Sequence, residues 1–282
     1  MLHLALLTAA ALTQAQDFSW SGAVAQGKTV RVKNIIGDIT VEAASGREAS
    51  VTAVKREGRR GDPEDVEIRR LEDDDGVTFC VVYPHHDDDG DCDMDSRRRH
   101  NNRWDDHNQN DTEVNFTVRV PAGVKLAATT VTGDVVARGL RADTEARSVS
   151  GDVRITDVEA TLVEAGSVSG NIELNRVNAE EVGAETVSGD VDFSGEIRPR
   201  GNYDLKTLSG DVVLMIPRNS GAEITGATFS GDFHSAFPIT TRSSSRYTRR
   251  QRINGTIGDG SARIRVESFS GDVDLRELGR QS

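Results

Sequence analysis

Ser148-Val149-Ser150-Gly151-Asp152-Val153 is the clearest copy of a phrase that recurs along this chain. Each copy has a hydroxyl residue, an apolar residue, a second hydroxyl residue, Gly, Asp or Asn, and an apolar residue. The phrase occurs seven times, centred on Gly133, Gly151, Gly170, Gly189, Gly210, Gly231 and Gly271. Successive glycines are 18, 19, 19, 21, 21 and 40 residues apart, and the last gap is two periods with one degenerate copy. Such a fixed period is typical of a repeat architecture.

The side-chain pattern around the glycine separates a hairpin from a strand. A two-residue hairpin loop at Gly151-Asp152 would place Val149 and Val153 on opposite faces and split the apolar set. Read as one extended strand, the phrase places Val149, Gly151, Val153 and Ile155 on one inner face. The other copies agree, so the same inner position is expected for Val168, Val187, Leu208 and Phe269.

The alternation changes phase on both sides of this strand, and each change predicts a corner or a bulge. One coil is then about three short runs joined by bends, and stacked coils pair their strands in parallel. The predicted fold is therefore all-β, a parallel β-solenoid preceded by a sheet-rich N-terminal region. The crossover rule favours a right-handed solenoid.

Three segments are expected in one continuous chain of 282 residues. Residues 1–15 read as a secretory signal peptide, with an apolar run ahead of a small-x-small cleavage site. Residues 16–120 form the N-terminal β-rich region, and 121–282 form the solenoid. For the apolar run of residues 1–15, a transmembrane anchor is the alternative, but this run is too short to span a bilayer, and no later stretch is apolar enough to do so. With the signal peptide, this predicts a protein of the periplasm, the cell envelope or the exterior. The net charge of -12 argues against a nucleic-acid binder.

A highly charged loop is expected between two strands, at residues 84–111. Asp89, Asp91 and Asp93 would line one side of an extended chain and offer ligands to a metal ion. The EF-hand pattern fails, because Ser96 stands where that loop needs Gly. A solvated acidic loop is the alternative, and weak Ca²⁺ binding fits both interpretations; no other cofactor is indicated.

The two cysteines, Cys80 and Cys92, are only twelve residues apart. Cys80 is expected on the outer face of its strand, and two accessible thiols this close pair readily in an oxidising compartment. The sequence therefore predicts a Cys80–Cys92 disulfide that tethers the charged loop to its own strand.

Two further features are candidates for binding. The aspartates that follow the repeat glycines would stack in register at about 5 Å, where like charges repel unless hydrogen bonds or cations relieve them. This set is Asp134, Asp152, Asp190, Asp211, Asp232 and Asp272. The Arg-rich segment 242–252 is either a solvated loop or a docking patch for an anionic polymer or for the acidic loop.

No catalytic motif is present: the sequence lacks Gly-x-Ser-x-Gly, His-Glu-x-x-His and a phosphate loop. Some parallel β-helices are nevertheless polysaccharide lyases or hydrolases built on surface Asp and Arg. A polysaccharide-acting enzyme therefore stays open as an alternative, which fold alone cannot decide.

The residues carry a family resemblance. Val-Pro-Ala-Gly-Val-Lys-Leu at 120–126, the repeat phrases, and the closing stretch 257–273 together resemble the bacterial "putative adhesin" family of secreted β-strand-repeat proteins. The resemblance covers about residues 18–278, and the charged loop and Arg-rich segment depart from it. It implies an exported envelope protein with a β-solenoid-like domain and no established catalytic residues. We expect a non-enzymatic, adhesin-like binding or scaffold module whose surface ligand is a glycan or a protein.

Overall fold

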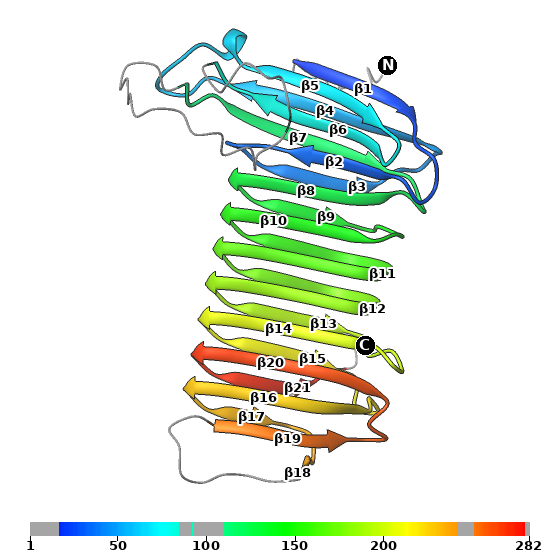
Figure 1. Ribbon diagram of the computed structural model, residues 1–282, viewed down its shortest axis with the longest axis vertical. Helices are drawn as coiled ribbons and strands as arrows, with labels where there is room; N and C mark the ends of the chain where they lie inside the picture. The colour runs from blue at the N-terminus through cyan, green and yellow to red at the C-terminus, as the bar shows by residue number, and fades with distance from the viewer. Residues whose placement is uncertain (1–16, 85–91, 93–109, 242–250, 280–282) are drawn as a thin grey trace, which may run out of the picture.

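The protein is a rod of stacked β-strands. The computed structural model describes residues 17–84, 92, 110–241 and 251–279, and the expected signal peptide lies outside them. The all-β prediction is confirmed; the one helical element among the described residues is a 3₁₀ turn, Pro63–Asp65. Figure 1 shows two layers of strands lying across the long axis of the rod.

In chain order the strands are β1 (Phe18–Ala23), β2 (Thr29–Lys33), β3 (Ile39–Ala43), β4 (Glu48–Arg56), β5 (Glu67–Asp73), β6 (Gly76–Val82), β7 (Glu113–Val120), β8 (Lys125–Thr132), β9 (Val135–Arg138), β10 (Thr144–Ser150), β11 (Val153–Ser169), β12 (Ile172–Ser188), β13 (Val191–Gly195), β14 (Asn202–Ser209), β15 (Val212–Ile216), β16 (Ala222–Ser230), β17 (Phe233–Ser235), β18 (Thr240–Thr241), β19 (Gln251–Ile257), β20 (Ala262–Ser270) and β21 (Val273–Glu277).

Each repeat forms one coil that visits both layers. The front layer holds the strand before the repeat glycine, and the back layer holds the strand after it (Figure 1). Matching residues of successive coils pair in parallel: Ala146 pairs with Ala165, and Ala165 with Ala184. The back layer keeps the same register, since Val153 pairs with Ile172. The Gly-Asp dipeptides therefore do not form hairpin tips.

The phrase is bent at its Gly-Asp step, which corrects the inner-face prediction. Strand β10 ends at Ser150 and β11 starts at Val153, so the chain turns from front to back layer between them. Before the turn the inward residue is Ser148, 4% exposed, and Val149 points outward with 42% exposed. The Ser148 hydroxyl donates to Gly133 O at 2.9 Å, which satisfies the buried hydroxyl. Val168, Val187, Leu208 and Phe269 are likewise exposed.

The repeat glycines lie in a column where no side chain fits. Gly189 has φ +149°, and a Cβ built on it would lie 2.2 Å from Gly170 O of the neighbouring coil. Gly151 repeats this, with 2.0 Å to Gly133 O. The glycine is required by close backbone approach at the corner, and not by a filled interior.

The predicted bend after the phrase is confirmed. Asp157 and Arg176 are non-glycine residues with φ of 57° and 53°. Burial resumes in the new phase at Val158 and Val177. The Arg176 guanidinium donates to both carboxylate oxygens of Asp157, at 2.5 and 2.7 Å, so these two successive corners are tied to each other.

The regular glycine spacing favours coils stacked in sequence order, but the structure shows a different order. The last coil, β20–β21, lies between β14–β15 and β16–β17 and pairs in parallel with both (Figure 1). Strand β19 runs back antiparallel along β16. The chain then continues into β20, which lies between β14 and β16. The N-terminal end is similar, since β2–β3 lies between β6–β7 and β8–β9.

The N-terminal end is closed by antiparallel strands and by the predicted disulfide. Strands β1, β4 and β5 pair antiparallel with their neighbours. Cys80 and Cys92 are bonded, which confirms that prediction. Cys80 is not accessible, however: it is 2% exposed, and its bonded partner Cys92 is 8% exposed. Lys33 Nζ donates to Cys92 O at 2.9 Å and helps to hold it there.

No helix among the described residues is long and apolar enough to cross a membrane.

Candidate functional site

The predicted aspartates form a hydrogen-bonded column at the corner between the two layers. At each step along it, a carboxylate or amide Oδ1 accepts the backbone N–H of the equivalent residue in the next coil, at 2.7 to 2.9 Å. In stacking order the column is Asn115, Asp38, Asp134, Asp152, Asn171, Asp190, Asp211, Asp272 and Asp232. The partly positive backbone N–H groups between successive coils offset the repulsion between neighbouring carboxylates.

One cation also lies in this column. Arg154 donates to Asp134 Oδ2 at 3.0 Å and to Asp152 Oδ2 at 2.5 Å. The hydrogen bond to Asp134 and the neighbouring charges raise the pKa of Arg154 against the effect of burial. Among the described residues, no three His, Cys, Asp or Glu side chains are grouped to hold a metal ion. The proposed metal ligands Asp89, Asp91 and Asp93 lie outside those residues, as do residues 242–250 of the Arg-rich segment.

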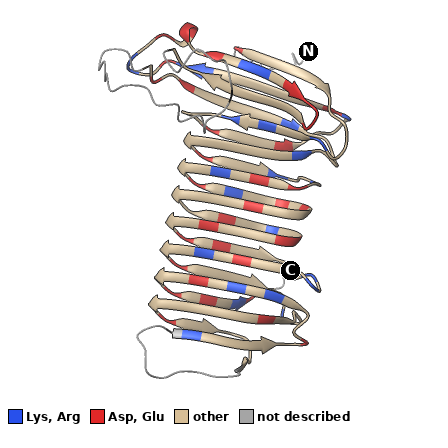
Figure 2. Cartoon of the chain, in the orientation of Figure 1, with Lys and Arg blue, Asp and Glu red and all other residues tan. Residues whose placement is uncertain are grey.

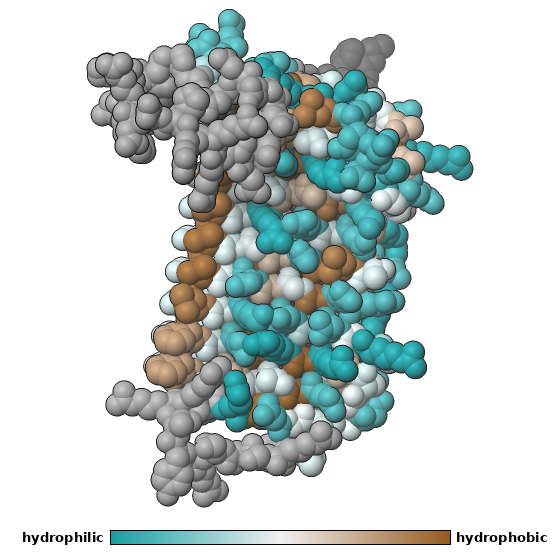
Figure 3. All heavy atoms as spheres, in the orientation of Figure 1, coloured by the Kyte–Doolittle hydropathy of each residue, from teal (hydrophilic) through white to brown (hydrophobic). Residues whose placement is uncertain are grey.

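The bend at the repeat glycine creates a second surface, made of residues that the alternation alone predicts on the inner face. The residue two positions before six of the seven repeat glycines points outward from the front layer, 41 to 52% exposed; at the remaining glycine, Gly133, the corresponding Val131 is half-buried. We call this set the apolar stripe; in stacking order it is Val149, Val168, Val187, Leu208, Phe269 and Phe229. Figure 3 shows it as a continuous hydrophobic column along one edge of the front face.

The stripe widens toward the end of the rod that holds β16. Three valines are followed by Leu208 and then by Phe269 and Phe229, whose rings stack with centroids 4.8 Å apart and planes 4° apart. Beside them lies a shallow groove of about 420 Å³, which Val187, Leu208 and both rings line. A contiguous exposed apolar patch on a soluble protein commonly marks an interaction site.

A row of charged and small residues borders the stripe on the front face. We call it the flanking row; in the same stacking order it is Arg147, Gly166, Glu185, Lys206, Glu267 and Ala227. Figure 2 shows both signs of charge mixed over the front strands, with no single-sign patch. The row gives the apolar stripe a polar border of alternating charge.

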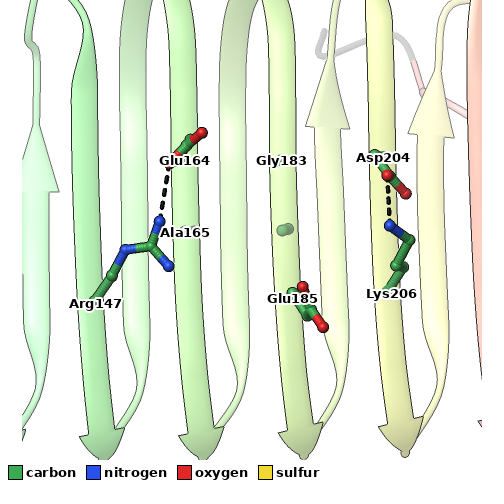
Figure 4. Close-up of a pocket in the computed structure, with 8 residues that line it drawn as sticks. Arg147, Glu164, Ala165, Gly183, Glu185, Asp204 and Lys206 are labelled. Carbon is green, nitrogen blue, oxygen red and sulfur yellow. Dashed lines mark hydrogen bonds and ion pairs between the residues drawn. The ribbon is translucent and has the colours of Figure 1, made fainter.

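Figure 4 shows the centre of this row, around a hollow of about 150 Å³. Arg147 pairs with Glu164 at 2.9 Å, and Lys206 Nζ donates to Asp204 at 2.5 Å. The Glu185 side chain has no ion-pair partner within the described part of the chain. Gly183 adds no side chain, which leaves the hollow open between these pairs (Figure 4).

The sequence contained a signal for the stripe. The residue two before the repeat glycine is apolar in every copy, while the residue three before it is Ser or Thr. A bend placed at the glycine puts the apolar residue outside. The alternation does not reveal this bend, because Val153 and Ile155 continue it beyond the glycine as a straight strand would.

Three solved bacterial structures are similar to this chain at low sequence identity. A "putative cell adhesion protein" from Clostridium sporogenes is 10% identical, with 93% of this chain and 99% of that chain covered and a TM-score of 0.39. A "putative adhesin" from Bacteroides fragilis is 11% identical, with 94% and 98% covered and a TM-score of 0.41. A "putative adhesin" from Parabacteroides distasonis is 13% identical, with 92% and 96% covered and a TM-score of 0.39.

A search of curated proteins finds no match. The family model described as Toastrack DUF4097 matches residues 88–276, most of the repeat region and the end of the N-terminal region. The chain therefore belongs to the Toastrack DUF4097 family.

Proposed function

We propose that the protein is a non-enzymatic, exported envelope protein that acts as an adhesin-like binding or scaffold module, and that the apolar stripe is its docking surface. The observation that carries the proposal is the stripe itself. Six exposed apolar side chains lie in register, one on each of six stacked coils. Repeat proteins commonly bind partners along such extended regular faces.

We also class the fold as a parallel β-solenoid with antiparallel strands at its two ends. The parallel pairing of successive coils supports this class. A solenoid of this kind is a rigid support, because each coil is bonded on both sides. Rigid elements present a binding surface with little loss of entropy on association.

The non-enzymatic part of the proposal is supported by how the aspartates are used. Asp134 and Asp152 each give one oxygen to a backbone N–H and the other to Arg154. A glycosidase pair needs one carboxyl group free to protonate the leaving oxygen and another free to attack or to activate water. The aspartate column instead has the arrangement of a structural network.

The experiment measures retention and turnover together. The full chain is applied to bacterial envelope fractions and to a glycan array, followed by an assay for new reducing ends. We expect saturable retention without product, reduced at least tenfold by Leu208→Ser or Phe269→Ser. Leu71→Ser is the matched control, because Leu71 is 40% exposed on β5 and Leu208 is 49% exposed. Turnover that disappears in Asp152→Asn would instead support a polysaccharide-acting enzyme.

A further inference from the structure

We propose that the partner of the apolar stripe is a second copy of this chain, docked antiparallel so that the two stripes pack against each other. This inference rests on the proposed function, since it names the partner of the same surface. The first argument is periodicity. The stripe presents one apolar side chain per coil, at a spacing of about 4.8 Å. The same stripe on a second rod has that spacing over its whole length.

The second argument is the taper of the stripe. In the antiparallel pair, a two-fold axis crosses the stripe midway along its six residues. It places Val187 opposite Leu208, Val168 opposite Phe269, and Val149 opposite Phe229. Each pair joins a small residue to a larger one, so the two rods stay at a nearly constant separation. A parallel arrangement would place each residue opposite itself, with Phe against Phe at one end and Val against Val at the other. Shape complementarity therefore favours the antiparallel pair.

The third argument is charge. The same axis keeps the flanking row of one copy opposite the flanking row of the other. Glu185 then faces Lys206 of the second copy, and this pair occurs twice because the contact is isologous. Glu267 of one copy faces Gly166 of the other, which has no side chain to obstruct it. Glu267 also lies diagonally from Arg147 of that second copy. Glu185 has no ion-pair partner among the residues described within one chain, and Lys206 has two donors left besides the one given to Asp204.

The small area of the contact between the two stripes predicts weak association. Five steps of about 4.8 Å give a stripe roughly 24 Å long, and the flanking row lies about 7 Å away. Such a patch lies below the roughly 800 Å² per partner of a standard interface. We therefore expect a dissociation constant in the micromolar range, so that association depends on a high local concentration.

Sedimentation velocity of the full chain from about 1 to 500 μM tests the association. We expect a monomer–dimer equilibrium that Leu208→Ser or Phe269→Ser weakens at least tenfold and that Leu71→Ser leaves unchanged. A wild-type chain that stays monomeric over this range overturns the inference. If that monomer still shows envelope retention that Leu208→Ser removes, the proposed function stands and only the identity of the partner is wrong.

Charge exchange tests the axis. Glu185→Lys alone and Lys206→Glu alone should each weaken self-association, because like charges then face each other. A mixture of these two single variants should associate as well as the wild type, because both cross-contacts become attractive again. Equal association of each variant alone and of the mixture would overturn the assigned register.

Oxidative cross-linking separates the two orientations. The native cysteines are bonded to each other and there is no free thiol among the described residues. In the antiparallel pair, Val149→Cys mixed with Phe229→Cys should give a heterodimer, and neither should cross-link alone. Cross-linking of Val149→Cys with itself would show a parallel pair and overturn the proposal. Leu71→Cys controls for random collision.

Discussion

Asn171 Oδ1 accepts the backbone N–H of Asp190 at 2.9 Å, in the place where every neighbouring coil uses an aspartate. The backbone N–H of Asn171 in turn donates to Asp152 Oδ1 at 2.8 Å. A neutral amide therefore performs the role of a carboxylate in the middle of the column. The repeated geometry needs an acceptor oxygen and not a negative charge, so the column is a structural network that neighbouring coils share.

Replacing Asp190 distinguishes this role from cation binding. Asp190→Asn should leave the free energy of unfolding nearly unchanged, because the amide oxygen still accepts the Asp211 N–H. Asp190→Ala should cost about 1 kcal/mol, the usual value of one hydrogen bond. Urea unfolding of both variants measures the difference. A thermal stabilisation by millimolar Ca²⁺ that Asp190→Asn abolishes would show that the column binds cations instead.

Gly189→Ala should destabilise the protein by roughly 3 kcal/mol or more, because its φ is +149° and the new Cβ would lie 2.2 Å from a backbone oxygen. Gly183→Ala is the control in the same coil, where the nearest atom to a new Cβ is a flexible Glu164 carbon at 3.9 Å. We expect Gly183→Ala to be neutral or slightly stabilising in denaturant unfolding. Equal stability of the two variants would contradict the close approach of the glycine column.

The inserted C-terminal coil should exchange its amide hydrogens slowly. Strand β20 pairs with β14 on one side and with β16 on the other, whereas β1 pairs, among the described strands, with β4 alone. Native-state hydrogen exchange should therefore place β20 among the most protected strands, although it is close to the end of the chain. Exchange of β20 as fast as that of β1 would favour stacking in sequence order.

The Tyr83 phenol should make the protein sensitive to alkali. Tyr83 is 5% exposed, its hydroxyl donates to Thr112 O at 2.6 Å, and burial raises its pKa to about 12. The folded state therefore favours the neutral form. The stabilisation of the folded state by the neutral Tyr83 phenol is complete below pH 10, where the phenol of the unfolded chain is also neutral. It is lost as the pH rises toward 12.

The loss amounts to about 2 to 3 kcal/mol of unfolding free energy. Denaturant unfolding between pH 9 and 12 measures it. Tyr83→Phe should cost about 1 kcal/mol at neutral pH through the missing hydrogen bond, and its stability should fall less steeply above pH 10. Parallel profiles of the wild type and the variant would assign the alkaline loss to other groups.

Several features were determined by the sequence alone. The period of the glycines indicates stacked coils, because identical phrases must occupy equivalent positions in a repeat. The phase change ahead of Val158 predicts the bend at Asp157, since a strand alternates strictly and a corner is needed to change the buried face. The spacing of Cys80 and Cys92 indicates their bridge.

Only the tertiary structure decided where each coil turns and in which order the coils lie. Val149 and Val153 lie an even number of positions apart, so a straight strand and a bend at Gly151 leave the same apolar pattern in the sequence. What requires glycine at the bend is Gly133 O of the next coil, which approaches Gly151 too closely for any side chain. The position of β20 between β14 and β16 is likewise a matter of long-range pairing. Every coil carries the same interface, so the sequence cannot say which neighbours it joins.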